Sequence, residues 1–137
     1  MNYSELMQQA IEARDYSYSP YSGYRVGAAL LSEDGRVFRG CNVENAAFSP
    51  GVCAERTAFV KAVSEGVQTF RAIAIVGGPA DGGLEMAPPC GVCRQVMMEF
   101  CNPKTFEIVL GTSTEELQVY KLEELLPLGF GPGNLGK

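Results

Sequence analysis

Apolar residues recur at helical spacing in two parts of the chain. Near the N-terminus, Leu6, Ala10, Ile11 and Ala13 form one stripe, and Asn2 followed by Glu5 three positions later is typical of a capping box. A second stripe lies within 54–63, and Gly66 after it is a natural end for a helix. The pattern predicts three helices, starting at Asn2, spanning about 53–65 and spanning about 90–101, with a last helical turn at 123–126.

Five other segments have the length and composition of strands. Asp34-Gly35 is a strong hairpin signal, so 24–31 and 36–42 are expected to pair antiparallel. The mostly apolar run 70–76 suits a strand covered on both faces. Segments 105–110 and 117–122 are joined by about six residues, and a parallel crossover needs about a dozen, so this pair is expected to be antiparallel.

The order of elements is helix, hairpin, helix, strand, helix, strand, strand. This order predicts an α/β fold, a three-layer α/β/α sandwich with a mixed five-stranded sheet. The length of 137 residues fits one domain covering 1–137. Connecting segments rich in Gly, Pro or Ser are expected to be loops, at 17–23, 45–51 and 77–89. The Gly-rich tail at 129–137 is expected to be extended.

Composition and charge narrow the possible functions. Hydrophobic residues make up 46% of the chain and charged residues 20%, which argues against disorder. No apolar run reaches about 18 residues and the N-terminus lacks a signal peptide, so we expect a cytoplasmic protein with no membrane partner. The net charge of −5 is a poor match for a phosphate backbone, so no nucleic-acid partner is expected. The chain contains no histidine, which removes every His-based catalyst or ligand.

The five cysteines carry the candidate chemistry. An odd number without an export signal argues against disulfides and leaves metal binding or catalysis. Cys90 and Cys93 form a CxxC that opens one predicted helix, and Cys53 opens the preceding one. Free backbone N–H groups at helix N-termini lower thiol pKa values, and thiolates are the form that binds metal. Three thiolates suit zinc and leave a fourth position open for water, as in catalytic sites.

Residues beside these cysteines add to the hypothesis. Glu55 lies two positions after Cys53 and is the candidate proton carrier. Arg56 and Arg94 each follow a cysteine motif and could donate hydrogen bonds to thiolates. Two alternatives remain open: a redox pair with one separate cysteine, and a non-catalytic zinc module that takes Cys41 or Cys101 as its fourth ligand.

Several blocks of sequence resemble the small homotetrameric cytidine deaminases. The resemblance covers nearly the whole chain, and three zinc-ligating cysteines without histidine are what the tetrameric branch uses. The blocks agree in order and spacing; they are GCNVENA at 40–46, CAERTA at 53–58, KAVSEG at 61–66, PCGVCRQ at 89–95 and ELLP at 124–127.

The resemblance implies hydrolytic deamination of cytidine and deoxycytidine to uridine and deoxyuridine in pyrimidine salvage, with one Zn²⁺ per chain. Cys53, Cys90 and Cys93 would hold the zinc, which activates the attacking water, while Glu55 moves protons. The same resemblance leaves open the alternative that the substrate is another nucleoside-like compound, such as a nucleoside antibiotic or an aminopurine.

Substrate-binding roles also follow from the resemblance. Asn42 and Glu44 would hold the ribose, and the backbone amide of Ala54 would bind the pyrimidine carbonyl. Tyr24 stands where the family usually has Phe, and Phe48 where it usually has Tyr. Phe130 matches an aromatic residue that reaches into a neighbouring subunit's site, so a homotetramer with shared active sites is expected.

Overall fold

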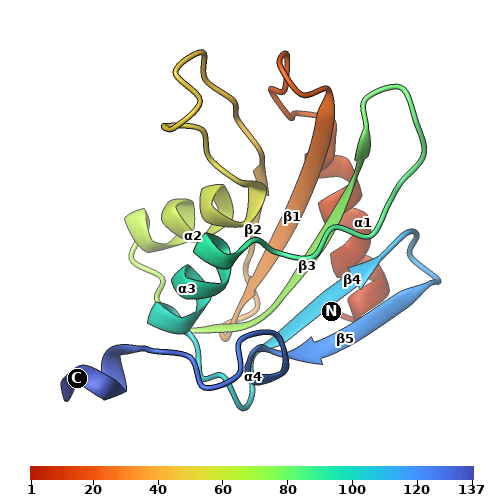
Figure 1. The fold of residues 1–137 in the computed structure, drawn as a ribbon. Helices are drawn as coiled ribbons and strands as arrows, with labels where there is room; N and C mark the ends of the chain where they lie inside the picture. The colour runs from red at the N-terminus through yellow and green to blue at the C-terminus, as the bar shows by residue number, and fades with distance from the viewer.

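A five-stranded sheet forms the centre of the computed structural model, which describes residues 1–137 (Figure 1). The strand order is β2-β1-β3-β4-β5. Only β3 and β4 pair in parallel, so the sheet is mixed, and the antiparallel pairings expected for the first and last strand pairs are confirmed. The strands are β1 (Tyr24–Ser32), β2 (Val37–Cys41), β3 (Phe70–Pro79), β4 (Glu107–Gly111) and β5 (Leu117–Lys121).

Helices cover both faces of the sheet and complete the predicted three layers. Helix α1 (Tyr3–Arg14) packs on one face, while α2 (Ala54–Ser64) and α3 (Gly91–Phe100) lie on the other (Figure 1). Asn2 caps α1 as expected, since its Oδ1 accepts a hydrogen bond from the Glu5 backbone N–H at 2.8 Å. The short α4 (Leu122–Leu125) follows β5 directly. None of these helices has the length and apolar character needed to cross a membrane.

Strand β3 is buried on both faces, as its apolar run predicts. Ile73 and Ile75 belong to the core that includes α2 and α3. Ala72, Ala74 and Val76 alternate with them and join the core beneath α1. This period-two division follows from the pleat of a strand, in which successive side chains point to opposite faces.

Two glycines allow helices to approach the sheet closely. A Cβ atom on Gly27 would come within 2.1 Å of the Ala10 carbonyl oxygen in α1. A Cβ on Gly40 would come within 2.3 Å of the Ala54 carbonyl oxygen in the first turn of α2. The missing side chain of Gly40 therefore sets how closely the N-terminus of α2 packs on β2.

Two predictions of local structure were wrong. β3 continues through 77–79, which were expected to be loop, because these residues pair with Tyr24 to Val26 of β1. The tail is not fully extended, since Pro132–Leu135 form one turn of 3₁₀-helix. The Asn134 side chain fixes that turn by accepting a hydrogen bond from the Gly131 backbone N–H at 2.8 Å.

Three connections project from the same end of the sheet. In Figure 1 they are the orange segment before β1, the yellow segment between β2 and α2, and the green segment after β3. Helices α2 and α3 both begin on this side of the molecule, which brings their N-termini beside these loops.

Candidate active site

The N-termini of α2 and α3 bring three cysteines together. Cys53 is the N-cap of α2, Cys90 is the N-cap of α3, and Cys93 lies in the first turn of α3. The Sγ atom of Cys90 is 3.7 Å from that of Cys53 and 3.4 Å from that of Cys93. All three sulfur atoms lie within 4.8 Å of one another. The convergence predicted from two consecutive helices is thus present.

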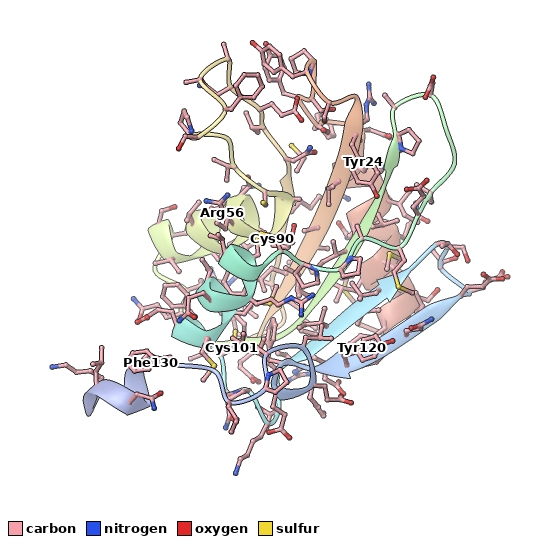
Figure 2. The ribbon with its side chains drawn as sticks, viewed as in Figure 1. Tyr24, Arg56, Cys90, Cys101, Tyr120 and Phe130 are labelled. Carbon is pink, nitrogen blue, oxygen red and sulfur yellow. The ribbon has the colours of Figure 1, made fainter.

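The spacing of the sulfur atoms fits zinc. Thiolates bound to a tetrahedral Zn²⁺ at about 2.3 Å lie about 3.8 Å from one another. The other two cysteines do not belong to the group. Cys101 packs against the hydrophobic core, and Figure 2 shows it well away from Cys90, beyond the C-terminal end of α3. Three protein ligands and one open position are typical of a catalytic zinc site rather than a structural one.

Arg56 lies beside the cysteine group. Its Nη2 atom is 3.6 Å from the Sγ of Cys53 and 3.4 Å from the Gly51 carbonyl oxygen, and Figure 2 shows Arg56 next to Cys90. Hydrogen bonding from Cys93, and then from the Arg56 guanidinium, lowers the pKa of the Cys53 thiol. A guanidinium here offsets part of the charge of −1 that Zn²⁺ and three thiolates would carry together.

Glu55 is the buried carboxyl of the site. It occupies the second position of α2 and its side chain is 4% exposed. Burial, and to a smaller extent the negative charge of Cys53, raises the pKa of Glu55 to about 7. A carboxyl with such a pKa exchanges protons readily near neutral pH, which general acid–base catalysis requires.

A cavity of about 470 Å³ opens in front of these groups, a size that accommodates a small molecule. The structure brings most of the predicted site residues to its wall, including Tyr24, Ala54 and Phe48. Sequence reasoning missed further apolar parts of the wall, namely Val26, Val43, Val52, Met86, Ala87 and Pro88. Val26 could have been found, because it lies two positions after Tyr24 and so on the same face of β1.

Asn42 and Glu44 line the cavity, and loop 17–23 holds both side chains. The amide of Asn42 accepts from the Val26 N–H and donates to the Tyr24 carbonyl, each at 2.9 Å, and it also accepts from the Ser17 hydroxyl. An amide nitrogen has two hydrogens, so one N–H of Asn42 stays available. Glu44 accepts hydrogen bonds from residues of the same loop. No sequence pattern predicted these supporting contacts.

Tyr24 also lines the cavity. Gly77 makes room for its ring, since a Cβ there would come within 2.8 Å of the Tyr24 Oη. The hydroxyl donates to Glu85 at 3.2 Å. Burial raises the pKa of Tyr24, and the hydrogen bond to Glu85 raises it further. The extra hydroxyl thus points to the loop after β3.

Two residues considered from the sequence lie elsewhere. Phe130 does not line the cavity of its own chain; its side chain is 59% exposed and lies far from Cys90 in Figure 2. Arg94 donates to the backbone carbonyl oxygens of Pro89 and Leu125, so it joins α3 to α4 and makes no hydrogen bond to a thiolate.

Comparisons with known proteins agree with this arrangement. The family described as "Cytidine and deoxycytidylate deaminase zinc-binding region" matches residues 1–109. The chain is 44% identical to the cytidine deaminase of Sporosarcina psychrophila over 98% of this chain and 96% of that protein.

Solved structures give the same result for the fold. The crystal structure of cytidine deaminase from Burkholderia pseudomallei is 45% identical and superposes with a TM-score of 0.85, covering 95% of this chain and all of that one. The enzyme from Mycobacterium tuberculosis is 35% identical, with a TM-score of 0.81 over 96% and 98% of the two chains. The chain therefore belongs to the cytidine and deoxycytidylate deaminase family that shares this zinc-binding region.

Proposed function

We propose that this protein hydrolyses cytidine and deoxycytidine to uridine and deoxyuridine with release of ammonia. The observation that carries the proposal is a group of three thiols beside one buried carboxyl, at a cavity that Cys53, Cys90 and Glu55 line. The full-length similarity to cytidine deaminases supports the same reaction. Residues 1–137 would act as one catalytic domain.

Cys53, Cys90 and Cys93 would hold one Zn²⁺ per chain. Bound zinc lowers the pKa of a coordinated water and so supplies hydroxide near neutral pH. Arg56 would keep Cys53 a weaker electron donor by hydrogen bonding to its sulfur, which preserves positive charge on the metal.

Glu55 would carry the protons of the reaction. It takes one proton from the attacking water and delivers it to N3 of the base as the bond from oxygen to C4 forms. It then carries the second proton from that oxygen to the amino nitrogen. The bond between C4 and the amino nitrogen breaks, and ammonia leaves together with uridine. Burial of Glu55 keeps bulk water from competing for these protons.

The cavity wall would select a nucleoside. The backbone N–H of Ala54 lies in the first turn of α2, where it has no carbonyl partner within the helix, and would donate to the pyrimidine carbonyl. Asn42 keeps one N–H free and Glu44 is an acceptor, so one sugar hydroxyl can accept from Asn42 and donate to Glu44. Tyr24 would face the base from the wall of the cavity.

Assembly and cellular role complete the proposal. The protein would form a homotetramer in which the exposed Phe130 of one chain completes the site of another. Leu128, beside it in the tail, is fully exposed, which suits burial against a partner chain. Three thiolate ligands require a reducing compartment, so the enzyme would act in the cytoplasm, in pyrimidine salvage.

An absorbance assay with a panel of substrates tests the proposal. Cytidine and deoxycytidine should be converted, whereas cytosine, adenosine and the two monophosphates should react much more slowly. A 5′-phosphate carries up to two negative charges, and the cavity wall contains Glu44 and Glu55 but no Lys or Arg. Comparable efficiency on cytidine and its monophosphate would contradict selection of a free nucleoside, and faster conversion of adenosine would contradict the assigned base.

A further inference from the structure

Loop 17–23 supplies a hydroxyl group to each of the two side chains assigned to the sugar. Ser17 donates to the Oδ1 of Asn42, and Ser22 donates to the Oε2 of Glu44. The loop also joins the 42–44 segment through its backbone, because Tyr18 N–H donates to the Asn42 carbonyl at 3.0 Å and Glu44 N–H donates to the Tyr18 carbonyl at 2.8 Å. The loop is thus fastened to the wall of the cavity.

Ser22 lies at the centre of this contact. Its Oγ accepts a hydrogen bond from the Tyr24 backbone N–H at 3.0 Å, which directs its own hydrogen toward Glu44. The other carboxylate oxygen of Glu44 accepts from the backbone N–H groups of Tyr21 and Ser22, at 3.0 and 3.1 Å. Three donors from one turn of chain therefore hold both oxygens of Glu44.

These hydrogen bonds to Glu44 have an electrostatic effect and an entropic one. The Ser22 hydrogen bond is the largest cause that lowers the pKa of Glu44, so the carboxyl stays ionised. A glutamate on an exposed loop otherwise samples several rotamers, and fixing it on binding costs free energy. A carboxylate that is already fixed avoids that cost when the ligand arrives.

We propose that Ser22 is a positioning residue for sugar recognition: its hydroxyl holds the Glu44 carboxylate in the orientation that accepts a hydrogen bond from a ribose hydroxyl. The inference rests on the proposed function, because it takes Glu44 as a sugar ligand. It predicts an effect on substrate binding that depends on the sugar hydroxyls. The base and its reacting C4 atom are bound by other residues, so the chemical step should not change.

The test compares cytidine with 2′,3′-dideoxycytidine, which lacks the ring hydroxyls, on wild-type protein and on Ser22→Ala. We expect Ser22→Ala to raise the KM for cytidine about tenfold, because one hydrogen bond to a charged group is lost. The kcat should stay within about twofold of the wild-type value. Binding of dideoxycytidine, measured as KM or as an inhibition constant, should change less than about twofold. Ser22→Thr keeps the hydroxyl and should restore the wild-type KM for cytidine.

Two controls separate positioning from general damage. Ser49→Ala removes an exposed serine of the neighbouring loop whose hydroxyl makes no hydrogen bond within the chain, and should leave both substrates unaffected. In a Glu44→Ala background, Ser22→Ala should have no further effect on the KM for cytidine. If Ser22→Ala weakened the binding of cytidine and dideoxycytidine equally, or left the KM for cytidine unchanged, the proposal would be overturned. A wild-type protein that does not deaminate cytidine would instead contradict the proposed function.

Discussion

Glu55 is the only carboxyl that is both buried and on the wall of the cavity. Because it would make each proton transfer, Glu55→Ala should lower kcat by about 10²–10⁴-fold while one zinc per chain is retained. Glu65→Ala, at the exposed C-terminal end of the same helix, is the matched control and should keep wild-type turnover. Turnover of Glu55→Ala above a tenth of the wild-type value would remove Glu55 from the mechanism.

The three sulfur atoms are expected to act as one ligand set. Cys90 caps α3 and contacts both other cysteines, so Cys90→Ala should abolish stoichiometric zinc and activity together. Cys101→Ala serves as the control because Cys101 packs against the core and lies outside the group, and it should keep one zinc per chain. Metal analysis by atomic emission measures both variants. One full zinc per chain in Cys90→Ala would show that the ligand set is wrong.

The parts of the site that lie close together in sequence could be predicted. Cys53 and Glu55 share one helix turn, and Cys90 with Cys93 shares another, so local spacing places each pair. The support for Glu44 could not be predicted, because Ser22 is twenty-two positions away and reaches it only when loop 17–23 folds over the segment after β2. The same holds for Glu85, which meets Tyr24 only across the sheet.

At the scale of elements, the position of α2 depends on its close packing against β2. Gly40→Ala would place a Cβ within 2.3 Å of the Ala54 carbonyl and 2.6 Å of the Ala58 N–H in α2. We expect a loss of about 1–3 kcal/mol in the free energy of unfolding from such overpacking, together with weaker zinc binding because Cys53 moves with the helix.

Urea unfolding and competition with a zinc chelator measure the two effects of Gly40→Ala. Gly83→Ala is the matched control, since a Cβ at Gly83 meets no atom within 4 Å. If Gly40→Ala matched wild type in both stability and zinc affinity, the close approach of α2 to β2 would have no role in placing the site.

The element order and the sheet were predictable because hydrophobic periodicity is local and strong. The apolar run in β3 predicted burial on both faces, and the short connection before β5 fixed its antiparallel pairing. The extension of β3 through Gly77, Gly78 and Pro79 was not predictable. Pairing with β1 overrides the loop preference of these residues, and that pairing is a tertiary effect. The 3₁₀ turn at Pro132 similarly depends on the particular Asn134 contact.

At the scale of the whole molecule, the exposed tail points to assembly. Three large apolar residues of the tail are exposed in the single chain: Leu128, Phe130 and Leu135. The Gln95 side chain donates a hydrogen bond to the Phe130 carbonyl at 2.7 Å, which anchors the start of the tail on α3. We expect light scattering to give about four times the chain mass of 14.7 kDa. A monomer in solution would contradict the proposed assembly.

Shared sites can be tested by mixing two inactive variants. Phe130→Ala chains co-assembled with Glu55→Ala chains should regain part of the activity, because a wild-type Phe130 can then serve a neighbour with an intact Glu55. Each variant assembled alone is the control and should stay at its own low rate. A tetramer without recovery after verified co-assembly would keep the assembly and exclude Phe130 from the shared site.

The proposed activity depends on one zinc, held by Cys53, Cys90 and Cys93. The most direct test adds zinc in steps to zinc-depleted protein and follows the absorbance change of cytidine at each step. We expect the rate of uridine formation to rise in proportion to bound zinc and to reach its plateau at one zinc per chain. Full activity in zinc-free protein, or a zinc-loaded protein that leaves cytidine unchanged, would contradict this expectation.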